Sequence, residues 1–347
     1  MTRADDDRAE RSARAQTTAV RSAGLIAAVV VLALAIALSL MVGASVISPA
    51  TLWHEIWHST GSEIGHDLRD WRIPRTVLAV EVGVALGLAG ALMQALTRNP
   101  LADPGILGVN AGAAAAVVVA MATLGVTELT QYVWFAVVGA ALVSLLVYGL
   151  GSRGPGGATP VRLTLAGTAV TAALTAFVAA MVILQPQTFE QFRFWELGSL
   201  AGRRWDVVGQ VAPFIGVGVL MALAMGRSLN VLALGEDTGR ALGMKPAYTR
   251  AIGAFAIVLL CGAATAAVGP IGFVGLVVPH MVRAITGPDQ RWILPYSLVL
   301  SPVLLLVADV IGRVLDHPGE VQVAVVTAFI GAPVFIALIR GRRIAQL

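Results

Sequence analysis

The stretch AIGAFAIVLLCGAATAAVGPIGFVGLVVPHMVRA, residues 251–284, decides how this chain folds. Arg283 is its only Asp, Glu, Lys or Arg residue, so the stretch is apolar enough to lie within a membrane. It is too long for one membrane-spanning helix, which needs about 20 residues. Gly269 and Pro270 stand near its middle, and proline breaks or kinks a helix because it lacks a backbone donor. The stretch therefore predicts two spans divided at Gly269-Pro270.

The rest of the chain is equally poor in charge. Of its 347 residues, 57% are hydrophobic and 13% are charged, against ~25% charged residues in a usual soluble domain. This composition excludes a water-soluble globule and indicates an all-α, polytopic membrane protein. Further candidate spans lie within residues 22–53, 76–97, 104–127, 129–152, 163–189, 207–226, 292–308 and 321–339. With the divided stretch, the prediction is about ten transmembrane helices.

The distribution of basic residues supports the division at Gly269-Pro270. With the N-terminus in the cytoplasm and ten spans, 17 Lys and Arg residues fall inside and 7 outside. Without the division the counts become 13 and 11, which removes the excess expected in cytoplasmic loops. We therefore expect both termini to be cytoplasmic. Residues 1–21 carry nine charged side chains and are expected to form a disordered tail before a single transmembrane domain at 22–347.

Two scarce residue types limit the chemistry of the chain. Lys245 is the only lysine and precedes Pro246, so the chain lacks the Gly-Lys-Ser/Thr of a phosphate-binding loop. Any ATP-driven work must therefore be done by another chain. Cys261 is the only cysteine, which excludes an intrachain disulfide.

Three groups of motifs carry a resemblance to a known family. They are RIPR at 72–75 with RNPLADPGILG at 98–108, then GPIGFVGLVVPHMVR at 269–283, and GAPVF at 331–335. Over roughly residues 23–340 the chain resembles the permeases of ABC importers for iron–siderophore complexes, haem and cobalamin. The resemblance implies a subunit of the bacterial cytoplasmic membrane that catalyses no reaction itself. Its expected cargo is a ferric siderophore, with haem and cobalamin as alternatives, moved by alternating access.

The same resemblance implies partners. Two ABC ATPase subunits are expected at the cytoplasmic face, and they would hold the ATP and Mg²⁺, so no cofactor or metal is expected in this chain. A substrate-binding protein is expected at the outer face. A second permease subunit, identical or paralogous, would complete the central pathway. Membrane lipid surrounds the subunit, and no nucleic acid is expected to bind.

Three arginines are candidates for docking the binding protein. Arg72 and Arg75 lie three residues apart, on one face of a predicted helix start at Pro74. Cations at a helix N-terminus oppose its dipole, at a cost of roughly 0.3–1 kcal/mol each, so an external anion would explain them better than local stability does. The resemblance adds Arg313 as a third docking position. The alternatives are contact with lipid headgroups beside Trp71 and, for Arg313, a helical ion pair with Asp309.

The most polar cytoplasmic segment, residues 227–250, is the candidate for ATPase coupling. The resemblance implies that it forms short helices that fit a cleft on the ATPase. The candidate contact residues are Gly235, Glu236, Asp237, Thr238, Arg240, Ala241, Leu242 and Gly243. The alternative is a solvated linker.

A polar stripe in the fifth predicted span is the candidate pathway surface. Thr164, Thr168, Thr171 and Thr175 follow spacings of four, three and four residues and therefore share one helix face. Such a stripe is unfavourable against lipid and is expected to face the bundle or a wet path. Gln94 and Asn110 are assigned to the same pathway. The alternative is that the threonines bond to their own helix or to neighbouring helices.

Two functions of other classes stay open. The segment HEIWH at 54–58 matches the H-E-x-x-H pattern of zinc proteases, although it lies in a predicted outer loop and could instead be an interfacial turn anchored by Trp53 and Trp57. A secondary transporter needs intramembrane ionisable pairs, and only Glu81 lies well inside a predicted span. For Glu81 itself a structural role is favoured over a ligand contact.

Overall fold

The computed structural model describes residues 3–43, 45–58, 61–126, 128–153, 160–316 and 319–340. Every element in these ranges is a helix, as expected from the sequence. Besides a π-helical turn η1 (Leu68–Arg72) and a 3-10 turn η2 (Pro104–Leu107), the helices are α1 (Arg3–Met41), α2 (Pro49–Trp57), α3 (Glu63–Asp67), α4 (Ile73–Thr97), α5 (Val109–Leu124), α6 (Leu129–Ser152), α7 (Pro160–Leu184), α8 (Pro186–Glu196), α9 (Trp205–Ala224), α10 (Gly226–Ala233), α11 (Glu236–Ala241), α12 (Pro246–Val268), α13 (Val274–Thr286), α14 (Gln290–Leu315) and α15 (Val323–Arg340). The helix α1 includes most of the charged segment that the sequence analysis expects to be disordered, and the side chains before Thr18 lie outside the described residues.

The long apolar stretch is divided where the sequence predicts. Helix α12 ends at Val268, and Gly269 follows with φ 80°, a backbone conformation that residues other than glycine rarely adopt. Helix α13 begins at Val274, directly after Phe273 at φ 68°. The predicted break at Gly269-Pro270 is therefore confirmed.

Within the described residues, seven helices are long and apolar enough to cross a membrane, and three shorter apolar helices accompany them. The shorter ones are Val109–Leu124, Val274–Thr286 and Val323–Ala337. All three coincide with spans that the sequence analysis expects. The count of ten spans stays a prediction, because these three helices fall below the length of about 20 residues that a span needs.

Helix α4 lies at the centre of the bundle. In its most apolar window 78% of the residues are buried, against 17% in α1 and 11% in α7. Small residues bring its neighbours close: a Cβ on Gly83 would lie 2.5 Å from the Cα of Pro302 in α14, and one on Gly90 would lie 1.9 Å from the carbonyl oxygen of Gly275 in α13. Only glycine permits backbones to approach so closely.

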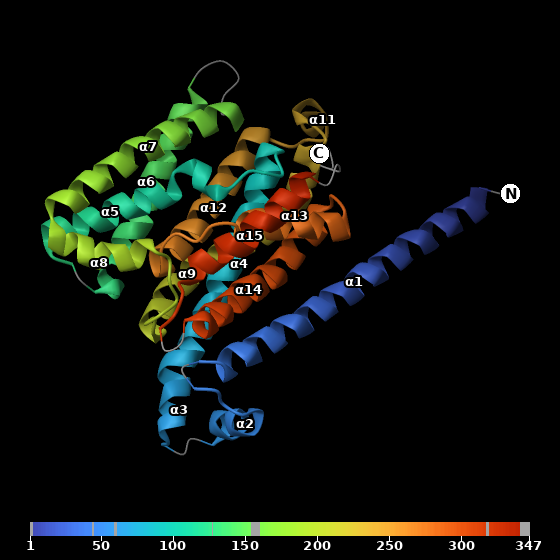
Figure 1. Ribbon diagram of the computed structural model, residues 1–347. Helices are drawn as coiled ribbons and strands as arrows, with labels where there is room; N and C mark the ends of the chain where they lie inside the picture. Colours follow the sequence, from blue (N-terminus) through green and yellow to red (C-terminus); the bar gives the residue numbers. More distant parts are fainter. Residues whose placement is uncertain are drawn as a thin grey trace.

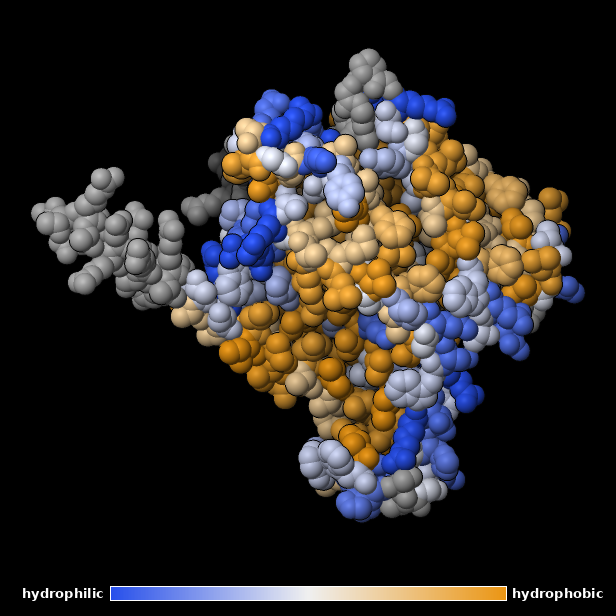
Figure 2. All heavy atoms as spheres, turned by 180° about the vertical axis from the view of Figure 1, so that it is seen from behind, coloured by the Kyte–Doolittle hydropathy of each residue, from blue (hydrophilic) through white to orange (hydrophobic). Residues whose placement is uncertain are grey.

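The bundle has two distinct ends (Figure 1). At one end α2 and α3 project beyond the other helices, and at the other end lie α11 and the end of α15. Figure 2 shows apolar residues across the middle of one face, with hydrophilic residues gathered above and below. This distribution is the one expected of a protein whose middle contacts lipid.

Candidate functional site

Arg75 and Arg313 bind the same carboxylate. Arg75 donates from Nη2 to Asp309 Oδ1 at 2.8 Å, and Arg313 Nη2 lies 2.8 Å from Asp309 Oδ2. Asp309 is 2% exposed, so both pairs are shielded from water. The helical ion pair considered for Arg313 is therefore confirmed. Arg75 also reaches Glu320, with Nη1 2.8 Å from Oε2, which ties the start of α4 to the segment before α15.

Arg72 is held by the C-terminal end of α1 and the segment that follows it. It is 5% exposed, and its guanidinium donates to the carbonyl oxygens of Leu40, Met41 and Ser45. Its Nε lies 2.6 Å from Asp67 Oδ2. The structure thus brings all three predicted docking arginines to one end of the bundle, but gives each of them partners within the chain.

A cavity of about 270 Å³ opens beside this cluster. Its walls include Arg72, Arg75 and Arg313, and also Arg203 from the segment before α9, with Asp67 and Glu320 as acidic members. Burial lowers the pKa of the Arg203 guanidinium, and the nearby Tyr132 opposes this shift. Arg203 was not predicted as a member of this site, because nothing in its spacing connects it to residues so distant along the chain.

The predicted coupling segment contains two short helices, α10 and α11. Glu236 binds Arg240 within α11, at 3.2 Å, and also Arg250 near the start of α12. Gly235 and Gly243 bracket α11 with φ values of 106° and 81°. The candidate contact residues Thr238, Arg240 and Leu242 are exposed on this helix. Arg250 was not predicted, and it fastens α11 to the transmembrane helix that follows.

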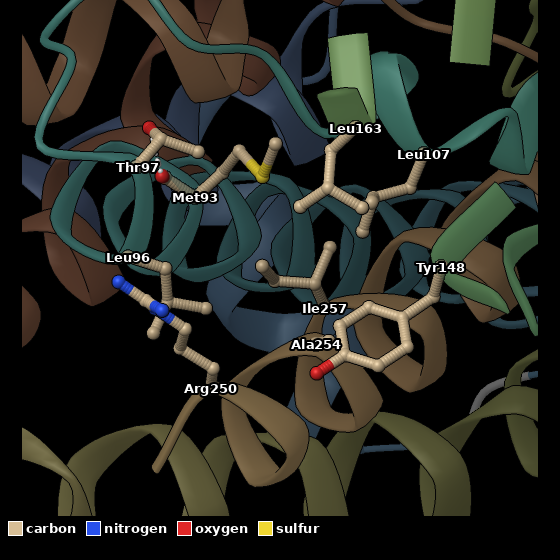
Figure 3. A pocket seen from close by; sticks show the side chains of 9 residues that line it. All are labelled: Met93, Leu96, Thr97, Leu107, Tyr148, Leu163, Arg250, Ala254 and Ile257. Atoms are coloured by element: carbon tan, nitrogen blue, oxygen red, sulfur yellow. Dashed lines mark hydrogen bonds between the residues drawn. The ribbon is translucent and has the colours of Figure 1, made fainter. Parts of the chain in front are cut away.

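Arg250 also lines a small apolar cavity of about 30 Å³ (Figure 3). Side chains from α4, η2, α6, α7 and α12 meet there. The members are Met93, Leu96, Thr97, Leu107, Tyr148, Leu163, Arg250, Ala254 and Ile257. The space admits about one water molecule, so we regard it as a packing defect at a five-element junction rather than as a ligand site.

The threonine stripe lies on the least buried span. Thr164, Thr168 and Thr175 are exposed and Thr171 is half-buried. The Thr168 hydroxyl donates to the carbonyl oxygen of Thr164 at 2.8 Å, which is the bond within the helix that the alternative interpretation requires. Around the stripe α7 exposes large apolar residues, among them Leu165 and Ile183.

The other two predicted pathway residues lie in helix interfaces. Gln94 is fully buried, and its Nε2 donates to the carbonyl oxygens of Gly275 (3.3 Å) and Leu276 (3.1 Å) at the start of α13. Asn110 Oδ1 accepts from the Thr265 hydroxyl at 2.9 Å, which links α5 to α12. None of these hydrogen bonds is to a threonine of the stripe.

The residues of the zinc-protease pattern make contacts within α2 and between α2 and α3. His54 and His58 are exposed, and their rings stack 5.0 Å apart. Glu55 is 6% exposed and accepts from the Ser62 hydroxyl at 2.8 Å, which joins α2 to the start of α3. Among the described residues, no group of three or more His, Cys, Asp or Glu side chains is placed to hold a metal ion.

Glu81 in α4 is half-buried, and its Oε2 has no hydrogen-bond partner within the described parts of the chain. It therefore does not show the ion pair that a proton- or sodium-coupled carrier would need.

Comparison with known proteins decides the family. The profile of the FecCD transport family matches residues 31–341. This chain belongs to the FecCD transport family. It is 47% identical over 329 residues to the ferric enterobactin transport system permease protein FepD of Escherichia coli (strain K12), which covers 94% of this chain and 97% of that one. It is 36% identical over 324 residues to the hemin transport system permease protein HmuU of Yersinia pestis, with coverage of 92% and 95%.

The architecture of this FecCD permease agrees with a solved structure. A metal-chelate type ABC transporter in an inward-facing conformation matches with a TM-score of 0.80 at 26% identity, covering 91% of this chain and 98% of the other. The protein is therefore an inner-membrane permease subunit of a metal-chelate type ABC importer, a transporter and not an enzyme. The family forms the permease part of importers that also contain an ATPase and a binding protein.

Proposed function

We propose that this permease translocates a ferric siderophore by alternating access, through ten spans with both termini in the cytoplasm. The observation that carries the proposal is the 47% identity to the ferric enterobactin permease over nearly the full length of both chains. Permeases described for hemin and cobalamin are 36% and 37% identical, which makes haem and cobalamin the second candidates.

The cargo is tested by uptake. The permease is reconstituted with its ATPase and binding protein, and ATP-dependent uptake is measured for labelled ferric catecholate, hydroxamate and citrate complexes, haem and cobalamin. We expect uptake of one ferric siderophore class only. Uptake of haem or cobalamin alone would contradict the proposal.

We propose that the four-arginine cavity receives an acidic group of the binding protein. Three of its arginines match the docking positions implied by the family resemblance. Of these three, Arg75 has the most exposed side chain, and its ion pair with Glu320 could be replaced by one with the binding protein. Arg75→Gln is expected to weaken binding of that protein several-fold at low salt and less at high salt, because exposed charge interactions are screened. The control is Arg193→Gln, an exposed arginine paired with Glu190 outside the cavity. If the binding protein has equal affinity for the two variants, Arg75 has no role in docking.

We propose that α11 transmits ATPase motion to α12 through Glu236. The support is its ion pairs to Arg240 and Arg250, which join the short helix to the span behind it. Glu236→Gln is expected to lower substrate-stimulated ATP hydrolysis while the ATPase stays bound. The matched control is Glu190→Gln in α8, far from α11 in the sequence. Intact stimulation in Glu236→Gln would show that the segment is only a linker.

We propose that a second permease subunit covers α7 and that the pathway runs along its threonines. The support is the exposure of α7, of which only 11% is buried in its apolar window. Single cysteines at positions 164, 168, 171 and 175, introduced in a Cys261→Ser background, are expected to react with an aqueous thiol reagent in the assembled transporter. Protection at all four positions would favour helix packing instead.

A further inference from the structure

A groove of about 560 Å³ lies where α9 and α10 meet the start of α14. Its residues belong to other segments than those that form the docking cavity and the threonine stripe. It lies next to the segment that leads into α11. Its walls are formed by Leu223, Ala224, Gly226, Arg227, Gln290, Arg291, Leu294 and Pro295. No acidic residue is among them.

Two arginines enter the groove from different helices. Arg227 belongs to the first turn of α10, and Arg291 belongs to the first turn of α14, where its side-chain stem packs on Gly226. Both are exposed, and neither guanidinium has a hydrogen bond or ion pair to any residue that the structure describes. Two unpaired cations facing one groove create a site that favours an anion with several acceptor oxygens.

The groove continues onto an apolar surface. Leu223 in its wall is 40% exposed, and Leu220, one turn earlier on α9, is 71% exposed. Because α9 is one of the helices apolar enough to span a membrane, we expect this face to lie against lipid acyl chains. The groove therefore joins a cationic end to a hydrocarbon-facing wall, which matches the two halves of a phospholipid.

The backbone N–H groups at this point are not available to bind the anion. The N–H groups of Gln290 and Arg291 already donate, at 2.8 Å to Asn230 Oδ1 and at 2.9 Å to Asp289 Oδ1. The charge for an anion must therefore come from the two guanidinium groups. Gln290 is 2% exposed, and its Oε1 is buried with no hydrogen-bond partner among the described residues. A headgroup with a hydroxyl donor would satisfy this acceptor.

We propose that this groove is a binding site for an anionic phospholipid with a hydroxyl-bearing headgroup, of which phosphatidylglycerol is the simplest example. Its phosphate bridges Arg227 and Arg291, its hydroxyl faces Gln290, and an acyl chain lies along Leu223 and Leu220. Basic pockets between membrane-spanning helices bind anionic headgroups in this way. The bound lipid fastens α14 to α10, next to the proposed ATPase contact.

The test is lipid titration of the full-length chain in non-ionic detergent, followed by native mass spectrometry. We expect phosphatidylglycerol to bind at least tenfold more tightly than phosphatidylcholine. The double variant R227Q/R291Q should weaken phosphatidylglycerol binding by roughly fivefold per arginine, about twenty-five-fold for the pair, and leave phosphatidylcholine binding unchanged. The matched control is R153Q/R340Q, two exposed arginines at the ends of α6 and α15.

Three outcomes would overturn the proposal. The first is equal loss of lipid in both double variants, which would mean that only overall charge matters. The second is displacement of the lipid by millimolar glycerol 1-phosphate, which would indicate a site for free phosphate esters. The third is a weakened ATPase assembly in R227Q/R291Q with unchanged lipid binding, which would assign the groove to the ATPase. None of these measurements depends on the transported cargo, so the proposed function can fail independently.

Discussion

Asp309 shows at the residue scale how a buried charge is tolerated. It is shared by Arg75 and Arg313, and Arg313 also donates to Ser39 Oγ and to the carbonyl oxygens of Ser39 and Val42. Breaking such a group by removing one member is costly, because the remaining charges stay buried without a counter-ion. Asp309 thus joins α4 to α14, and Arg313 extends the group to α1, at the end of the bundle that carries the docking cavity.

Asp309→Asn is therefore expected to destabilise the protein by about 3–5 kcal/mol, since it leaves two arginines without their shared counter-charge. The measurement is the unfolding midpoint of the purified permease in detergent. Glu128→Gln serves as the control, because Glu128 is exposed and makes no capping bond to α6. If Asp309→Asn lowers the unfolding midpoint no more than Glu128→Gln does, the two arginines find other partners.

At the scale of elements, glycines set the distances between α4 and its neighbours. Gly83 and Gly87 face α14, where a Cβ on Gly87 would lie 2.0 Å from Ser301 Oγ. Gly90 and Gly275 face each other between α4 and α13, and Gln94 binds the same start of α13 one turn later. The broken helix beyond Gly269 is thus supported by close contact and by two side-chain hydrogen bonds.

Gly90→Ala is expected to destabilise the bundle by about 1–3 kcal/mol or more, because its methyl group would collide with the backbone of Gly275 and force the helices apart. The same unfolding assay measures this effect. Gly149→Ala in α6 is the matched control, since nothing lies within 4 Å of the added Cβ, and we expect it to be neutral or slightly stabilising. Equal stability of the two variants would contradict the close α4–α13 contact.

At the scale of the whole molecule, the two ends differ in what they expose. One end carries α2, α3 and the arginine cluster, and the other carries α11 and the groove beside α14. Three of the ten predicted spans coincide with apolar helices that are shorter than the other seven. The proposed orientation rests on the sequence-based prediction that most of the basic residues lie on the cytoplasmic side.

Cysteine accessibility tests this topology. In a Cys261→Ser background, single cysteines replacing His58, Glu128 and Glu320 are expected to react with a membrane-impermeant thiol reagent added outside the cell. Cysteines replacing Arg153, Asp237 and Asp289 should react only after the inner membrane is opened. Outside labelling at position 289 would show that α13 does not cross, which would contradict the ten-span arrangement.

Much of the fold could be predicted from the sequence because its signals are local. Low charge, runs of apolar residues and Gly269-Pro270 act within a few turns of helix, so the helical class, most span positions and the central break were all predictable. The motifs likewise indicated the family. The short helix α11 and the Asp309–Arg313 pair could be predicted for the same reason, because each lies within one short stretch of the chain.

Only the tertiary structure decided which distant residues meet. Arg75 and Asp309 are 234 positions apart, and no spacing rule connects them, nor does one connect Arg203 to the same cavity. Gln94 was predicted for the pathway from its motif, yet packing places it against α13. The sequence by itself determined where most of the helices form, and its basic residues predict the proposed orientation in the membrane. The partners of the buried charges depended on how the helices pack, because a charge buried away from water is stabilised by whatever three-dimensional neighbour the fold supplies.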